Sequence, residues 1–150
     1  MLIRYALAAL LTVGLASAAM AAGSSSSSKP SKLDVAEKAV KAGNYTRALV
    51  LLKKVIADEP KNADAWNWIG FSHRNLKQFD EALSAYQKAL ATDPEHRGAN
   101  EYLGELYLKT GKPAKAKERL KKLDDICTFG CEEYDDLKQA IAAYEAAHKG

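Results

Sequence analysis

Apolar residues recur at helical spacing from about residue 31 to the end of the chain. In the last stretch, Tyr134, Leu137, Ile141 and Tyr144 stand at i, i+3, i+7 and i+10, on one face of a helix. At the first, the Ser31 hydroxyl with an acid three residues later favours a helix start. The pattern predicts an all-α fold of seven helices. Their expected ranges are about 31–42, 45–58, 63–76, 79–92, 97–110, 113–126 and 132–148.

An internal repeat organises these helices. The segments 43–45, 77–79 and 111–113 each precede a similar helical pattern, and each is offset from the last by 34 residues. The same offset relates Pro60 to Pro94, and Ala36 to Gly70 and Gly104. A period of 34 residues built from two helices is the signature of the tetratricopeptide repeat. From about residue 29 to about residue 130, the chain therefore resembles this family.

The middle unit, residues 63–96, carries the resemblance best. Where the family has its Trp, Leu, Gly, Ala, Phe, Ala and Pro, this unit has Trp66, Ile69, Gly70, Ala82, Tyr86, Ala89 and Pro94. It departs from the pattern at His73, where Tyr is usual, and the flanking units have Lys32 and Asn100 in place of the Trp. The resemblance implies a solenoid of three units, about residues 29–62, 63–96 and 97–130. We expect residues 131–150 to form a C-terminal helix that caps its open end.

Residues 1–21 have the pattern of a secretory signal peptide. A short positive start ending at Arg4 precedes an apolar run through Leu15, and small residues follow. The apolar run is shorter than the roughly 20 residues that span a bilayer, which argues against a membrane anchor. We expect cleavage after Ala21, a flexible Ser-rich leader over residues 22–30, and a mature chain in the bacterial periplasm with no membrane span.

Composition and motifs narrow the function classes. The chain has 22 Lys and Arg against 19 Asp and Glu, a formal charge of +3 that becomes +2 when Arg4 is removed. This balance gives no electrostatic reason to expect a nucleic acid as partner. The sequence has no nucleophile elbow, phosphate loop, paired-His metal motif or Gly-rich dinucleotide turn. We expect no enzyme activity, no catalytic residue, no metal and no cofactor.

The two cysteines, Cys127 and Cys131, allow two interpretations. In an oxidising compartment, thiols four residues apart around a glycine turn favour a disulfide. Closing so short a loop contributes roughly 2 kcal/mol and would fix the turn into the last helix. The alternative is a small metal or redox carrier that uses the same pair, with His73, His96 or His148 as further ligands if the fold brings one near.

Two charged clusters also have alternatives. Glu132, Glu133, Asp135 and Asp136 open the last helix, where negative charge complements the helix dipole, and a calcium site is the other interpretation. Between residues 109 and 122 there are seven basic residues and one acid. We interpret this run as a solvated helix surface, and weak contact with an anionic surface is the alternative.

The resemblance implies protein or peptide binding, because the first helices of successive units in this family line a concave groove. Carried over to this chain, the partner-binding residues are Glu37, Lys41, Asn67, Phe71, Arg74, Asn75, Glu101, Glu105 and Leu108. Leu33, Val40, Asp64, Gly98 and Lys109 complete the strip. In this interpretation Arg74 offers charge and Phe71 an apolar anchor, whereas the alternative is that Phe71 and Leu108 only pack between units.

One branch of the family grips a terminal carboxylate with Lys, Asn and Arg side chains. At the matching positions this chain has Leu33, Glu37, Trp68, Gly98 and Tyr102, so that clamp is missing. With Glu37, Glu101 and Glu105 on the strip, we expect a ligand of basic or neutral hydrogen-bonding character. The sequence thus predicts a periplasmic interaction scaffold, with a metal or redox carrier and a self-associating structural protein as the other classes.

Overall fold

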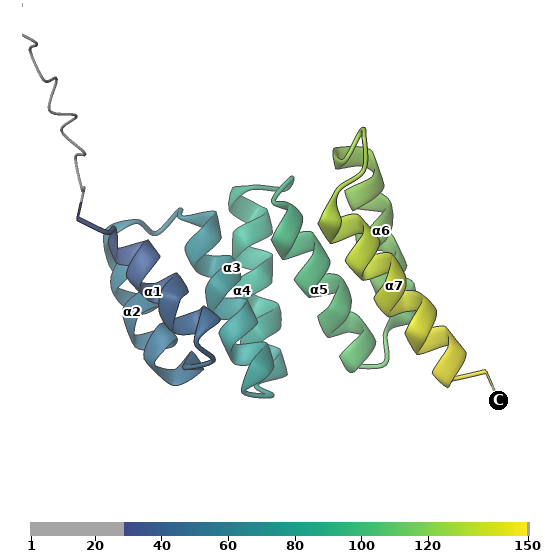
Figure 1. Cartoon of the computed structure of the whole chain (residues 1–150), viewed down its shortest axis with the longest axis horizontal. Helices are drawn as coiled ribbons and strands as arrows, with labels where there is room; N and C mark the ends of the chain where they lie inside the picture. The colour runs from purple at the N-terminus through teal and green to yellow at the C-terminus, as the bar shows by residue number, and fades with distance from the viewer. Residues whose placement is uncertain (1–28, 150) are drawn as a thin grey trace, which may run out of the picture.

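The computed structural model describes residues 29–149, and the described part is a row of seven α-helices with no strand. Consecutive helices lie side by side from α1 and α2 at one end of the row to α6 and α7 at the other (Figure 1). The predicted signal peptide, and residues 22–28 of the predicted leader, lie outside the described residues. The helices are α1 (Lys32–Lys41), α2 (Tyr45–Asp58), α3 (Ala63–Asn75), α4 (Phe79–Thr92), α5 (Arg97–Lys109), α6 (Pro113–Ile126) and α7 (Glu132–Ala147).

Each helix begins and ends within one residue of the range predicted from the sequence. The Ser31 side chain accepts a hydrogen bond from the Asp34 backbone N–H, and the Asp34 carboxylate accepts one from the Ser31 N–H, as in a capping box. The turns between paired helices repeat the 34-residue period in their backbone: Gly43, Lys77 and Gly111 all have a positive φ, between 61° and 72°. Glycine adopts this conformation without strain, which explains its place in two of the three turns.

Close helix crossings explain why small residues recur at fixed positions. A Cβ on Gly70 of α3 would lie 2.6 Å from Cδ1 of Tyr86, a fully buried residue of α4. In the third unit the space over Gly104 of α5 is filled by α7 instead, because a Cβ there would lie 2.6 Å from Cδ2 of Leu137. The repeat therefore keeps a small residue at this position, but the side chain that packs against it differs between units: Tyr86 covers Gly70 and Leu137 covers Gly104.

The core extends along the whole row as three adjoining clusters. The first joins α1 to α4 around Leu52 and Val55, the second joins α4 to α5 around Tyr86 and Leu106, and the third joins α5, α6 and α7. In the third cluster Leu137 and Ile141 of α7 are buried, while Tyr134 and Tyr144 pack at its edge. The seventh helix thus covers the open end of the stack with the apolar stripe identified in the sequence.

Candidate partner-binding groove

Half-buried aromatic side chains form a connected set on α2, α3 and α5. The Phe71 ring is at its centre, with ring centroids 6.2 Å from Tyr45, 5.7 Å from Trp68 and 5.0 Å from Tyr102. We call these four residues the aromatic row. Each is neither fully buried nor fully exposed, so the row helps to join the first two units to the third and keeps apolar surface accessible to a ligand.

Arg74 is engaged inside the protein and is not free to meet a ligand. It is 8% exposed, pairs with the Glu105 carboxylate of the next unit, and places its guanidinium 5.2 Å from the Phe71 ring centroid and 5.1 Å from that of Tyr102. A buried guanidinium needs such a partner because an unpaired buried charge is costly. The expectation that Arg74 supplies ligand-binding charge is therefore corrected: Arg74 and Glu105 join the second unit to the third.

The other residues of the predicted strip differ in accessibility. Lys41 is exposed, with its Nζ 3.6 Å from a Glu37 carboxylate oxygen, and the exposed Asn75 donates a hydrogen bond from Nδ2 to the Phe71 carbonyl oxygen at 2.8 Å. Leu108 is 8% exposed and belongs to the core cluster of α5, α6 and α7. Its assignment to the groove is corrected, because α7 covers the face of α5 that an open third unit would expose.

A pocket of about 350 Å³ lies at one end of this region, and four helices contribute carboxylates to it. Its lining holds six acidic residues and neither Lys nor Arg, and we call it the acidic pocket. Three of the acids belong to α7, where the sequence predicted either charges that complement the helix dipole or a calcium site. The lining consists of Glu37 from α1, Asp64, Asn67 and Trp68 from α3, His96, Gly98, Glu101 and Tyr102 at or in α5, and Glu132, Glu133 and Asp136 from α7.

Glu101 is the most buried acid of the pocket, at 7% exposure. The pKa of Glu101 is raised to about 7, first because burial disfavours its charged form and then because Asp136, Glu133 and Glu132 repel it; Arg74 opposes the shift. Beside it, Asn67 is 4% exposed, and its Oδ1 has no hydrogen-bond partner. The pocket therefore holds two buried polar side chains. Within the described part of the chain, Asn67 leaves its Oδ1 without a hydrogen bond, and Glu101 has no ion-pair partner.

The acidic pocket occupies the place where a carboxylate clamp would be. Four of the five positions that carry the clamp in one branch of the family line it here, as Glu37, Trp68, Gly98 and Tyr102. In this chain, an acid and two aromatic residues, Glu37, Trp68 and Tyr102, therefore replace the basic and amide side chains of the clamp.

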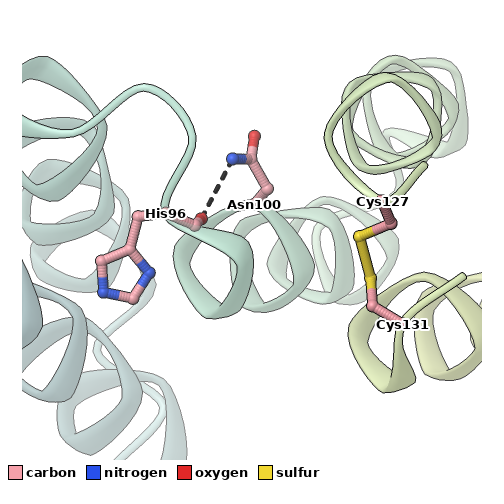
Figure 2. The surroundings of a disulfide bond; sticks show 4 residues. All are labelled: His96, Asn100, Cys127 and Cys131. Atoms are coloured by element: carbon pink, nitrogen blue, oxygen red, sulfur yellow. Dashed lines mark hydrogen bonds between the residues drawn. A yellow bond between two sulfur atoms is a disulfide. The ribbon is translucent and has the colours of Figure 1, made fainter. Parts of the chain in front are cut away.

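Cys127 and Cys131 are joined by a disulfide in the turn between α6 and α7 (Figure 2), with their Cα atoms 5.7 Å apart. Figure 2 also shows that the His96 ring points away from the sulfur atoms, and its Nε2 lies 3.0 Å from Asp64 Oδ1. His73 contacts Gln78, and His148 contacts the Tyr144 carbonyl oxygen. Among residues 29–149 there is no group of three His, Cys, Asp or Glu side chains placed to hold a metal ion.

Some basic side chains of α6 make contacts with other residues of the chain. Lys117 Nζ lies 2.5 Å from a Glu145 carboxylate oxygen of α7, and Arg119 donates a hydrogen bond to Asn100 Oδ1 at 3.2 Å. The Lys115 ammonium lies 5.6 Å from the Tyr107 ring centroid. Within the described residues, no helix is both long and apolar enough to cross a membrane.

The stacked helix pairs and the surface along α1, α3 and α5 define a helical-repeat interaction protein. A family model described as "Tetratricopeptide repeat" matches residues 39–82 and 73–126, more than half of the chain. The chain belongs to the tetratricopeptide repeat family, which confirms the resemblance seen in the sequence. Members of this family are typically non-enzymatic scaffolds that bind protein or peptide partners.

The chain is also similar to larger proteins over part of their length. It is 38% identical over 77 residues to human Superkiller complex protein 3, which covers 51% of this chain and 5% of that protein. It is 30% identical over 113 residues to Small glutamine-rich tetratricopeptide repeat-containing protein 2 of Saccharomyces cerevisiae, which covers 75% of this chain and 31% of that protein. The chain thus spans a small part of the length of these relatives.

Solved structures share the fold at low sequence identity. The type III secretion translocator chaperone SycD of Yersinia enterocolitica aligns with a TM-score of 0.70 at 15% identity, covering 79% of this chain and 92% of that one. The first tetratricopeptide repeat domain of Spaghetti (RPAP3), solved with the HSP90 peptide SRMEEVD, aligns with a TM-score of 0.67 at 20% identity, covering 76% and 93%. These likenesses confirm the all-α solenoid.

Proposed function

We propose that the protein is an exported scaffold that holds an extended segment of a partner protein along its groove in the bacterial periplasm. The observation that carries this proposal is the half-buried aromatic row directly beside the acidic pocket, which shares Trp68 and Tyr102 with it. Apolar rings give a ligand contact area at low entropic cost, and the neighbouring polar groups fix its orientation.

The negative charge of the acidic pocket limits which kind of partner segment can bind. The similar Spaghetti domain was solved with a peptide that ends in Glu-Glu-Val-Asp. A peptide of that kind would meet six carboxylates here, and like charges at close range in a partly buried site repel strongly. The groove therefore suits a segment that is neutral or basic where it reaches the pocket.

Capture from a periplasmic extract tests the scaffold function. Phe71→Ala removes the centre of the aromatic row, and Val50→Ala is a matched control that truncates a side chain 55% exposed on α2. Partners that are retained by the wild type and by Val50→Ala should be lost with Phe71→Ala, provided that circular dichroism shows the same helix content for both variants. Equal recovery with all three proteins would show that the aromatic row does not bind the partner.

Export and oxidation form the second part of the proposal. They are supported by the pattern of residues 1–21 and by the 5.7 Å Cα separation of Cys127 and Cys131, which falls in the normal range for a disulfide. The full chain expressed in a bacterium should be recovered in the periplasmic fraction with Ala22 at its amino terminus and with no free thiol. Retention of residues 1–21, or two thiols that alkylate before reduction, would contradict this part.

A further inference from the structure

Most acids of the acidic pocket have no counter-ion. Glu37 lies near Lys41, and Asp64 contacts His96, but Glu101, Glu132, Glu133 and Asp136 form no ion pair among residues 29–149. Water solvates the exposed carboxylates of this set, Glu132 and Asp136, whereas Glu133 is half-buried and Glu101 is buried. Four helices bring these acids to one pocket of about 350 Å³, where repulsion of the buried Glu101 is only partly screened.

Buried polar groups in the wall of the pocket point to a missing ligand. The Asn67 Oδ1 is buried without a hydrogen-bond partner, and Glu101 is 7% exposed and forms no ion pair among residues 29–149. Buried polar side chains are normally satisfied by protein or ordered water, and an unpaired buried carboxylate is especially costly. A ligand that brings positively charged donors into this pocket would satisfy Glu101.

The remaining wall suits a cation carried on an apolar stem. Trp68 and Tyr102 line the pocket, and both are half-buried, so their rings can contact the methylene groups of a long side chain or the cation itself. The volume is near the low end of the about 300–1,000 Å³ found for ligand pockets, which fits one side chain better than a folded surface.

We propose that the acidic pocket binds a single lysine or arginine side chain of the partner segment, with the cation between Glu101 and the acids of α7. This inference rests on the proposed function, since the segment that carries the side chain is the one held along the aromatic row. It also gives α7 a second role, because the helix that caps the core supplies half of the carboxylates in the pocket, namely Glu132, Glu133 and Asp136.

The test uses a blocked five-residue peptide with a central lysine and flanking glycine and serine, and the same peptide with norleucine, which keeps the stem and removes the charge. Binding is followed by the ¹⁵N shift of the Trp68 indole N–H in the pocket. Trp66 is an internal reference, because its indole N–H donates to the Pro60 carbonyl oxygen at 2.9 Å and its ring does not line the pocket. We expect a saturable shift of Trp68 with the lysine peptide alone.

Two variants of equal charge change locate the binding energy. Glu101→Gln should weaken binding of the lysine peptide by about tenfold or more, as expected for the loss of a charge-assisted hydrogen bond. Glu118→Gln removes an exposed carboxylate on α6, outside the pocket, and should change the affinity by less than about twofold. An equal loss in both variants would overturn the proposal, because it would show only the attraction of net charge.

Two other results would also overturn it: an equal Trp68 shift with the norleucine peptide, or a larger saturable shift with calcium chloride at matched ionic strength. The scaffold function fails separately. In one outcome, Phe71→Ala loses a captured partner, Glu101→Gln retains it, and the lysine peptide does not shift Trp68. This outcome would support the scaffold function and contradict the lysine site. In the other outcome, the lysine peptide binds but no captured partner depends on Phe71. This outcome would contradict the scaffold function and support the cation site.

Discussion

The substitution Glu101→Gln should make the free protein more stable at pH 8 and leave its stability unchanged at pH 4. Glu101 is 7% exposed, and glutamine keeps its shape while removing its charge. Nine charged or titratable groups line its pocket or interact with its charge. They are Glu37 of α1, Asp64 and Arg74 of α3, Tyr86 of α4, His96 and Tyr102 at or in α5, and Glu132, Glu133 and Asp136 of α7. Arg74 is the one Arg or Lys in this set, and it is already paired with Glu105.

The direction follows from the pKa of Glu101, which is raised from 4.5 to about 7 by burial and by the neighbouring acids. Below pH 4.5 the carboxyl is protonated in both the folded and the unfolded state. Between pH 4.5 and 7 the folded state keeps a proton that the unfolded state has lost, so the free energy of unfolding falls as the pH rises. Above pH 7 the residue is charged in both states, and the full penalty of its burial is present.

The size of the effect follows from the same values. A pKa raised from 4.5 to about 7 corresponds to about 3 kcal/mol at most. Solvent in the acidic pocket screens the carboxylate, so we expect a gain of about 2 kcal/mol for Glu101→Gln at pH 8. For a domain of this size, that gain raises the melting temperature by about 5–10 °C.

Thermal unfolding followed by circular dichroism at 222 nm, at pH 4 and pH 8 and constant ionic strength, measures both ends of this window. Glu118→Gln is the control, and its stability should stay within about 0.5 kcal/mol of the wild type at each pH. Two results would contradict a penalty from the buried charge of Glu101: destabilisation by Glu101→Gln at pH 8, or an effect of the same size at both pH values. The first result would show that the Glu101 carboxylate is satisfied in the folded state, and the second that its charge does not cause the effect.

Three further substitutions test the packing. Leu108→Ala should lower the free energy of unfolding by about 2–5 kcal/mol in urea titration, because it opens a cavity in the core; a loss below 1 kcal/mol would return this residue to the groove. Gly70→Ala should cost about 1–3 kcal/mol in the same assay, since its Cβ meets the buried Tyr86 ring, and no loss would mean that the crossing widens freely. Replacing Cys127 and Cys131 by serine should lower stability by about 2 kcal/mol relative to the oxidised protein, whereas an unchanged urea midpoint would leave the disulfide without a stabilising role.

The pattern of residues along the chain was sufficient to predict the helices, their period and their family. These features depend on local interactions: apolar spacing within one helix, a cap such as Ser31, and a left-handed turn residue such as Gly43 or Gly111. Each of these local features depends on a few neighbouring residues, and similar features recur at intervals of 34 residues. For that reason the predicted helix ends agree with the structure to within one residue.

Contacts between helices that are distant in the chain fix which groove residues are accessible, and the repeat pattern does not show these contacts. The partner of Arg74 is Glu105, 31 residues away in the next unit, and the repeat pattern does not state that these two side chains meet. By its position in the repeat Leu108 is a groove residue, but in the structure it packs in the core cluster with α7. By their position in the sequence the acids of α7 complement the helix dipole, but the packing of Leu137 against Gly104 also places them in the same pocket as Glu101. The path of α7 back onto α5 sets both outcomes, because it depends on packing between helices far apart in the chain.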